Sequence, residues 1–386
     1  MADCTTPWTD RIWQPVAPGT GHHAGRVTLH EDRIDQPYRW KKTGRVLVGD
    51  LFHHRVPDGF ITRVFDAMEA PPNREHTFLV LTEHPGRMRD FVQQRETRRQ
   101  RYAAKFDHCP TEAMRTSPAA QEARTRAGKP PANIWLGARV EDQRAADLRI
   151  PALLETPAAA RFLVCEPLTG PVDLHDYLSE LRDVTDPYAD APEGAIVDGM
   201  ERHGEQWHRI ARLHWVIAGG GSGTGARPLH PQWVRDIRDA CARTDVAFYF
   251  TQHGEYRAVP VVDDPNFSGG RAYDNPLHGG RSSATIRERG PSHTFRAATT
   301  RLLRPGERTR STWLLDENTI AVRVGKAAAG RELDDRLHNA VPSRPLGSDS
   351  PIMVPGDTAC MASPLRPPAQ RPCESCPYRR DVPAGI

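Results

Sequence analysis

One carboxylate stands where a parallel-sheet protein would use it for chemistry. Glu166 directly follows the apolar run Arg161–Cys165, which has the length and composition of a buried strand. Partial burial there would raise the pKa of the Glu166 carboxyl group, which suits acid–base catalysis or the holding of a ligand hydroxyl or amine. Cys165 is expected to face the sheet as a small apolar side chain. Glu166 is therefore the first candidate catalytic residue.

Polar residues follow two other apolar runs in the same way. Asp50 comes after Arg45–Gly49, and His84 comes two positions after Thr77–Thr82. Parallel sheets place their sites at the carboxyl ends of strands, so Asp50 and His84 join the candidate catalytic residues. Two alternatives stay open: strand ends carry polar residues simply because they meet solvent, and His84 is an ordinary hydrogen-bonding residue.

A glycine-rich loop supplies the candidate cofactor-binding backbone. The apolar run Trp215–Ala218 is followed by the sequence GGGSGTG. Bare glycine amides can line a concavity for an anion or for the polar tail of a cofactor, although a tight turn that needs positive φ would have the same composition. The loop fits neither the dinucleotide-binding GxGxxG pattern nor a phosphate loop. The candidate cofactor-binding residues are Gly219, Gly220, Gly221, Ser222, Gly223 and Arg227.

Alternating apolar runs and helical segments must position these residues. Helices are expected over about 58–68, 85–102, 143–155 and 231–244, and each lies between short apolar runs. This alternation predicts an α/β fold with a parallel sheet. About seven strands favour a partial or complete TIM-type (β/α) barrel over an open doubly wound sheet.

The expected domain organisation follows from where the alternation stops. The barrel core occupies 1–254, with insertions at about 103–132 and 173–206. Residues 255–335 form an insertion or cap and the last barrel-associated segment. Residues 336–386 are Pro-rich with little apolar content, which predicts an irregular and mostly disordered tail.

Composition favours a cytoplasmic protein without a membrane segment. No apolar stretch approaches the roughly 18 residues of a membrane span, and the N-terminus has no signal-peptide core. The seven cysteines form no disulfide framework, which favours a reducing compartment. The net charge of +3 does not by itself indicate nucleic acid. The arginine-rich run 95–101 is either a solvated helix face or a polyanion-binding surface.

The tail contains the one CxxC pair of the sequence. Cys373 and Cys376 are candidate zinc ligands, but a tetrahedral zinc site needs four ligands and only one such pair is present. The segment from Pro372 to Gly385 also resembles the opening of a small domain described as DUF6283. That resemblance implies a fused or truncated module.

A series of short segments carries a resemblance that covers most of the chain. In order, they are Trp8–Asp10, Trp13–Pro15, Leu29–Trp40, Asp50–His53, Val80–Thr82, Trp135–Gly137, Val140–Gln143, Arg149–Pro151, Cys165–Pro167, Gly219–Gly220, Gly225–Pro228 and Gly325–Lys326. Over about residues 5–335 the chain resembles the phage Gp37/Gp68 proteins, also described as the DUF5131 family. The resemblance implies a radical-SAM-like partial barrel, an origin in a phage and, in typical members, a 4Fe–4S cluster with S-adenosylmethionine.

The sequence departs from the family pattern where the cluster would bind. The cysteine motif of the family follows the first strand, but Val16–Gly25 contains no cysteine here, and thiolates ordinarily hold cluster iron. The usual Glu of the glycine loop is Gly221. The usual Lys after Leu-Thr is Glu83, and the usual Lys before the last-strand Gln is Thr251. These departures predict a member that has abandoned cluster chemistry.

We therefore expect a degenerate radical-SAM-like barrel that lacks the iron–sulfur cluster and binds a nucleotide-like or S-adenosylmethionine-like ligand. Two alternatives remain open. One is an active enzyme with an unrecognised cluster ligand set or a metal-free mechanism through Glu166 and His84. The other is a non-catalytic protein that binds nucleic acid or a partner enzyme through arginine-rich surfaces. The sequence leaves the substrate, the reaction and any catalysis open.

Overall fold

The chain is described by a computed structural model. It covers residues 8–18, 27–178, 212–263, 271–277 and 312–342, residue 266, and short strands within 181–209 and 280–302. Of the tail predicted at 336–386, residues 343–386 lie outside the described residues, and these include Cys373 and Cys376.

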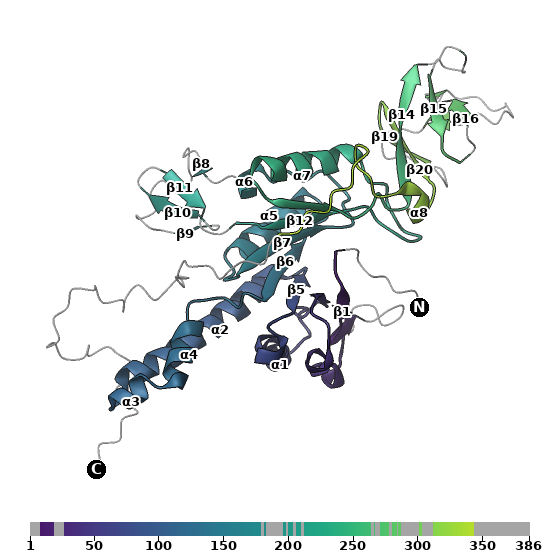
Figure 1. Ribbon diagram of the computed structural model, residues 1–386. Coiled ribbons are helices and arrows are strands. Elements are labelled where there is room, and N and C mark those ends of the chain that lie inside the picture. Colours follow the sequence, from purple (N-terminus) through teal and green to yellow (C-terminus); the bar gives the residue numbers. More distant parts are fainter. Residues whose placement is uncertain are drawn as a thin grey trace.

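A seven-stranded parallel sheet, curled into a half-barrel and flanked by helices, forms the centre of the molecule (Figure 1). Its strands, in spatial order, are β1 (Arg11–Trp13), β4 (Arg45–Val48), β5 (Thr77–Thr82), β6 (Ile134–Arg139), β7 (Ala160–Cys165), β12 (Trp215–Ala218) and β13 (Ala247–Phe250). Every neighbouring pair runs parallel. The predicted α/β fold with a partial barrel is confirmed.

Both faces of the sheet are buried. Each strand contributes to both faces, because successive strand side chains point to opposite sides. The helix-facing series includes Phe78, Val80 and Cys165, which pack into the main core with the helices. The concave series forms a second cluster, whose members are Trp8, Leu79, Leu81, Trp135, Ala160, Phe162, Val164, Trp215, Ile217 and Tyr249. In the sequence, each strand is therefore a continuous apolar run. Within that run, alternate side chains belong to the helix-facing and the concave cluster.

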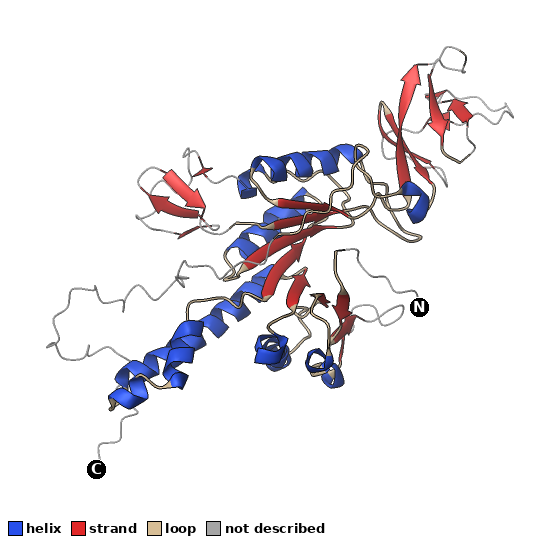
Figure 2. Cartoon of the chain, in the orientation of Figure 1, coloured by secondary structure: helices blue, strands red, loops and turns tan. Residues whose placement is uncertain are grey.

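Helices cover the convex face of the sheet (Figure 2). They are α1 (Asp58–Glu69), α2 (Pro85–Lys105), α5 (Gln143–Leu154) and α7 (Pro231–Arg243), close to the predicted ranges, and the short α6 (His175–Leu178), which was not predicted. In α7, Pro231 occupies the first turn and the His230 imidazole accepts a hydrogen bond from the Gln232 amide at the helix start. The apolar stripe of α7, Val234, Ile237, Ala240 and Cys241, faces the core.

The expected insertion at 103–132 is helical. It contains η5 (Phe106–His108), α3 (Glu112–Arg115) and α4 (Pro118–Arg126), and α4 lies along α2. Ser117 begins α4 by accepting a hydrogen bond from the Ala120 amide, and buried Ala120 and Ala123 allow close packing. We call residues 85–132 the helical arm. The sequence suggested a loop or insertion here. The buried face of these short polar helices consists of alanines, which give little apolar signal.

Residues 256–323 contain a second, antiparallel sheet, where an insertion or cap was expected. Its strands, in spatial order, are β16 (Gly280–Ser283), β15 (Arg271–Asn275), β14 (Tyr256–Asp263), β20 (Thr319–Arg323) and β19 (Thr312–Asp316). It has its own small core of Val261, Tyr273, Leu314, Ile320 and Val322. The helix α8 (Lys326–Ala329) then leads the chain back to the half-barrel, where residues 338–340 hydrogen-bond along β13.

The remaining elements are short. They are the hairpin β2 (Val16–Pro18) and β3 (Val27–Leu29), η2 (Glu31–Arg33), η3 (Gln36–Arg39), η4 (Pro71–Asn73), a four-stranded sheet of β8 (Leu181–Arg182), β11 (Gln206–Arg209), β10 (Met200–His203) and β9 (Ile196–Val197), and the pair β17 (Thr285–Ile286) and β18 (Arg301–Leu302). Within the described residues, no helix has the length and apolar character needed to span a membrane.

Candidate functional site

The concave face changes character toward the carboxyl ends of its strands. The series Phe162 and Val164 on β7 continues to Glu166, and the series Leu79 and Leu81 on β5 continues to Glu83. On β6 the corresponding series ends at Arg139. We call this end the polar mouth and define it as Glu83, Arg139, Glu166, Ser222, Thr251 and Gln252.

Arg139 links the carboxylates at the end of the central strands. Its Nη1 donates a hydrogen bond to the main-chain oxygen of Glu166 at 2.8 Å. Its Nε lies 3.4 Å from Oε1 of Glu83, and both of these side chains are partly exposed. One guanidinium group therefore connects the loops after β5 and β7.

Gln252 joins Glu166 to the glycine loop. Its Nε2 donates to Oε1 of Glu166 at 2.9 Å and lies 3.2 Å from Oγ of Ser222. The residue is only 7% exposed, and its Oε1 is buried without a hydrogen-bond partner in the described part of the chain. A buried polar atom left unpaired costs about 1–3 kcal/mol. This amide oxygen is thus a buried acceptor without a partner beside Glu166.

Burial is the main influence on the Glu166 carboxyl group and raises its pKa. Hydrogen bonding to Gln252 and Thr251, together with the positive charges of Lys326 and Arg139, offsets part of this effect. The direction agrees with the sequence-based expectation for a carboxylate at the end of an apolar strand. A carboxyl group of this kind can exchange a proton or hold a polar group of a ligand.

Two glycines of the loop are required by close packing. A Cβ on Gly219 would lie 1.9 Å from Oγ1 of Thr251, and a Cβ on Gly220 would lie 2.1 Å from the main-chain oxygen of His253. Gly223 has a φ of +90°, in the left-handed region that favours glycine. The loop is therefore glycine-rich in part because the end of β13 approaches it closely.

Several loop amides already have partners inside the protein. The amide of Gly220 donates to the main-chain oxygen of Gln252 at 2.8 Å, and the amide of Gly223 donates to Oε1 of Glu255 at 3.0 Å. Nη2 of Arg323 lies 3.7 Å from Oε2 of the same Glu255 carboxylate. The Glu255 carboxylate thus already accepts a hydrogen bond from the Gly223 amide, which was expected to face an external anion. Gly221 lies buried beside Pro167, whereas Ser222 and Arg227 are exposed, and the Ser222 hydroxyl contacts the side chain of Gln252.

Asp50 and His84 form a second group. Oδ1 of Asp50 accepts hydrogen bonds from Oγ1 of Thr82 at 2.7 Å and from the Phe52 amide at 3.2 Å. The His84 amide donates to the same Thr82 hydroxyl. Thr82 continues the helix-facing series of β5, so these bonds fix the loops after β4 and β5. Among the described residues, these hydrogen bonds connect Asp50 and His84 to Thr82 and Phe52, and none of them reaches Glu166.

Three histidines gather beside this second group. The ring centroids of His53 and His84 are 5.8 Å apart, and those of His53 and His54 are 4.2 Å apart. Burial, followed by the neighbouring His54, lowers the pKa of His53, which favours its neutral form. His84 thus lies with His53 and His54, apart from Glu166, although the sequence suggested that His84 and Glu166 act together.

The cysteines of the described chain do not fit an iron–sulfur cluster. Cys165 lies in the helix-facing core, Cys241 lies on α7, and Cys109 lies in the helical arm. Burial raises the pKa of the Cys165 thiol, and it raises that of Cys241 to about 12, so both disfavour the thiolate that binds iron. No group of three or more metal-binding side chains occurs within the described ranges.

Four residues of the polar mouth were not selected from the sequence. Glu83, Arg139, Thr251 and Gln252 were not chosen as site residues, although Glu83, Thr251 and Gln252 stand at predicted strand ends. Two-residue alternation was the available signal, because it places Arg139 in line with Trp135 and Gly137 on the concave face. The pairing of Gln252 with Glu166 depends on the packing of β13 against the glycine loop.

Comparison with known proteins gives one result. No curated protein and no solved structure matches the chain significantly. A family model described as "Protein of unknown function (DUF5131)" matches residues 4–342, which include the half-barrel, the helical arm and the antiparallel sheet. The chain therefore belongs to the DUF5131 family.

Proposed function

We propose that this protein binds a nucleotide-like or S-adenosylmethionine-like small molecule at the polar mouth of its half-barrel, without an iron–sulfur cluster. The proposal includes a radical-SAM-like, phage Gp37/Gp68-type origin for the barrel. The observation that carries it is the buried, unpaired Oε1 of Gln252 beside Glu166. Ligand pockets commonly place a few convergent polar groups at the carboxyl ends of parallel strands.

The polar atoms of the mouth define what the ligand must offer. Oε1 of Gln252 needs a donor, such as an amino or hydroxyl group. The Glu166 carboxyl group can accept from a ribose hydroxyl when ionised and can donate when protonated. The exposed residue Ser222 contributes a hydroxyl that accepts from the same Nε2 of Gln252 as Glu166 does. A ligand that carries both amino and hydroxyl groups matches this set.

Positive charge near Glu166 adds a second requirement. Lys326 and Arg139 both act on the Glu166 carboxyl group, and Lys326 is exposed at the start of α8. They favour a ligand with a carboxylate or phosphate in addition to its donor groups. S-adenosylmethionine carries a carboxylate, and a nucleotide carries phosphate. The charges therefore favour ligands that carry at least one anionic group.

Cluster chemistry is not part of the proposed function. Cys109, Cys165 and Cys241 lie on three separate elements, and none belongs to the polar mouth. Any acid–base step would use Glu166 without His84, which lies with His53 and His54. Anaerobic reconstitution with iron and sulfide is expected to give no brown chromophore. A stable cluster in the reconstituted protein would contradict this part.

Calorimetric titration of the full chain tests the ligand directly. S-Adenosylmethionine and, separately, ATP serve as probes, and at least one is expected to bind. The Gln252→Leu variant should bind about tenfold more weakly, because the ligand donor would lose a buried acceptor worth about 1–3 kcal/mol. Glu166→Gln should also change the affinity. Gln232→Leu is the matched control, since Gln232 is exposed on α7 and should leave binding unchanged.

The failure of both probes with the unmodified protein would remove the proposed ligand class. Equal loss of affinity in Gln252→Leu and Gln232→Leu would place the ligand elsewhere. Circular dichroism of each variant shows whether weaker binding reflects a lost contact or a lost fold.

A further inference from the structure

The helical arm presents three cations in one row along α2. Arg98, Arg101 and Lys105 are exposed and spaced by three and four residues, so they lie on one side of the helix. At 1.5 Å per residue, the row spans roughly 10 Å. We call these three residues the basic stripe. It lies on the part of the molecule that extends away from the half-barrel (Figure 1).

Charge is unevenly distributed between the arm and the rest of the chain. Residues 85–132 contain 11 Lys and Arg against 5 Asp and Glu, a formal net charge of +6. The other residues contain 41 Lys and Arg against 44 Asp and Glu, a net charge of −3. The net charge of +3 for the whole protein is therefore the sum of a strongly basic arm and a slightly acidic remainder.

Most other arginines of the arm have structural partners. Arg95, Arg99 and Arg126 all contact the buried carboxylate of Glu69. Arg124 pairs with Asp107 at 2.6 Å. These pairs hold the helices of the arm together and to α1. Within the described part of the chain, no salt bridge involves Arg98, Arg101 or Lys105, so their charge is directed at solvent.

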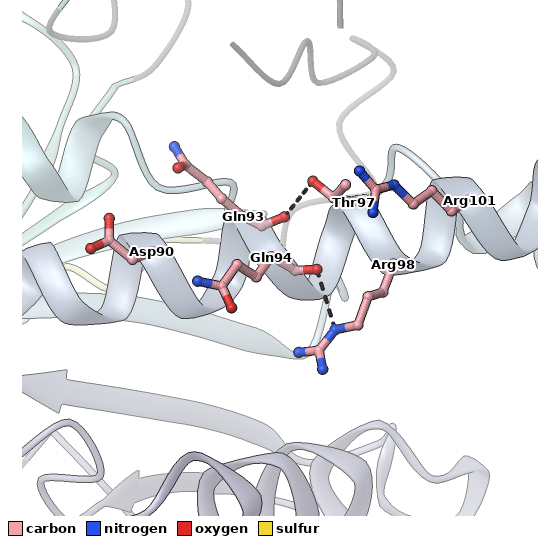
Figure 3. Close-up of a pocket in the computed structure, with 6 residues that line it drawn as sticks. All are labelled: Asp90, Gln93, Gln94, Thr97, Arg98 and Arg101. Atoms are coloured by element: carbon pink, nitrogen blue, oxygen red, sulfur yellow. Dashed lines mark hydrogen bonds between the residues drawn. The ribbon is translucent and has the colours of Figure 1, made fainter. Parts of the chain in front are cut away.

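Two residues of the basic stripe line a groove of about 520 Å³ on α2, whose lining is Asp90, Gln93, Gln94, Thr97, Arg98 and Arg101 (Figure 3). Thr97 Oγ1 donates to the Gln93 carbonyl, and Arg98 Nε donates to the Gln94 carbonyl, so both bonds stay within the helix. The side-chain amide of Gln94 lines the groove together with the cations. Such groups contact phosphate and sugar oxygens in nucleic-acid complexes.

An aromatic ring stands beside the stripe. Tyr102 is 55% exposed and follows Arg98 by one helical turn. The edge-to-face contact with Phe106, at 5.4 Å between ring centroids, orients the Tyr102 ring. Proteins that bind single strands combine a positively charged track for the backbone with aromatic side chains on which bases stack.

We propose that the basic stripe and Tyr102 form a binding surface for single-stranded nucleic acid. Arg98, Arg101 and Lys105 contact successive phosphates, and Tyr102 stacks on a base. This surface lies on α2, separate from the polar mouth, and the inference does not depend on the proposed small-molecule function.

Fluorescence anisotropy with the full chain tests the proposal. The probes are labelled oligothymidine of about 20 nucleotides and a duplex of the same length. The triple variant Arg98→Gln, Arg101→Gln, Lys105→Gln should bind the single strand at least tenfold more weakly at low salt. Its slope of log affinity against log salt concentration should be shallower by about 2, because roughly 0.7 counterion is released for each phosphate contact.

Two matched controls separate charge, stacking and location. Arg39→Gln, Lys41→Gln, Lys42→Gln removes the same charge from an exposed segment near β4 and should keep the wild-type slope. Tyr102→Ala should weaken single-strand binding about five- to tenfold, whereas Tyr102→Phe keeps the ring and should bind like the wild type. The proposal is overturned by the absence of single-strand binding, by tighter binding to the duplex, or by equal losses in both triple variants.

Discussion

The two ends of the concave face are built on the same strands and yet have opposite character. At the amino end, Trp8, Trp135 and Trp215 are buried and pack edge to face, with ring centroids 5.9 Å apart for Trp8 and Trp215. At the carboxyl end lie the carboxylates and amide of the polar mouth. The comparison indicates that the same strands fill one end of the concave face with aromatic rings and carry polar side chains at the other.

Replacement of a tryptophan at the aromatic end should have the largest effect. Trp215→Ala is expected to lower the free energy of unfolding by about 3–5 kcal/mol, because it leaves a large cavity among the surrounding rings. Chemical denaturation measures this change. Trp233→Ala is the control: Trp233 is only partly buried and stacks on His230, so its loss should be clearly smaller. Equal losses would mean that the aromatic end is not a special source of stability.

A single methyl group tests the close packing at the polar mouth. Gly219→Ala should cost about 1–3 kcal/mol, since its Cβ would fall 1.9 Å from Oγ1 of Thr251 and must displace the β13 end. Gly225→Ala is the matched control, because nothing lies within 4 Å of the added carbon. We expect that control to be neutral in a denaturation experiment. If both variants are equally stable, the loop and β13 do not pack as described.

Acid should weaken the aromatic end through His214 at the start of β12. Burial and the neighbouring Arg161 lower the pKa of His214 to about 4, below its ordinary value of 6.5. The folded protein therefore binds fewer protons than the unfolded chain in this window, and stability falls as the pH drops from 6.5 toward 4. We expect a contribution of roughly 1–2 kcal/mol after allowance for partial exposure. His214→Asn, which keeps a hydrogen-bond acceptor, should lose correspondingly less stability between pH 7 and pH 4.5 than the wild type.

The polar mouth should show the opposite pH dependence. Because burial raises the pKa of Glu166, the folded protein holds this proton more tightly than the unfolded chain. Its contribution is therefore full below the ordinary pKa of 4.5 and is lost as the pH rises through the folded value. Glu166→Gln removes this dependence, so its stability relative to the wild type should increase between pH 4 and pH 8. A constant difference across that range would contradict a raised pKa.

Strand alternation also explains how much of the site could be predicted from the sequence. The apolar runs and Glu166 could be located, because each strand ends abruptly at a polar residue. Asp50 looked equivalent to Glu166, but it follows a different side-chain series and bonds to Thr82 on the helix-facing side. In a continuous apolar run both series look alike, so the sequence alone does not indicate which strand-end residues share a face.

Other parts depended on long-range packing that no local pattern encodes. The glycine loop suggested an anion cradle, whereas Gly219 is small because Thr251 approaches it, and the Gly223 amide is taken by Glu255. The arm around α4 has polar helices whose buried face is formed by Ala120 and Ala123, too weak a signal to separate helix from loop. These contacts join residues that lie far apart in the chain.

Hydrogen–deuterium exchange with and without ligand tests the central claim most directly, because it reports where a small molecule binds. With saturating S-adenosylmethionine or ATP, slower exchange should be confined to peptides that cover 164–168, 219–225 and 250–255. Gln252→Leu should abolish that protection, and Gln232→Leu should retain it. Unchanged exchange at these peptides with both ligands, or protection restricted to the helical arm, would contradict a ligand site at the polar mouth.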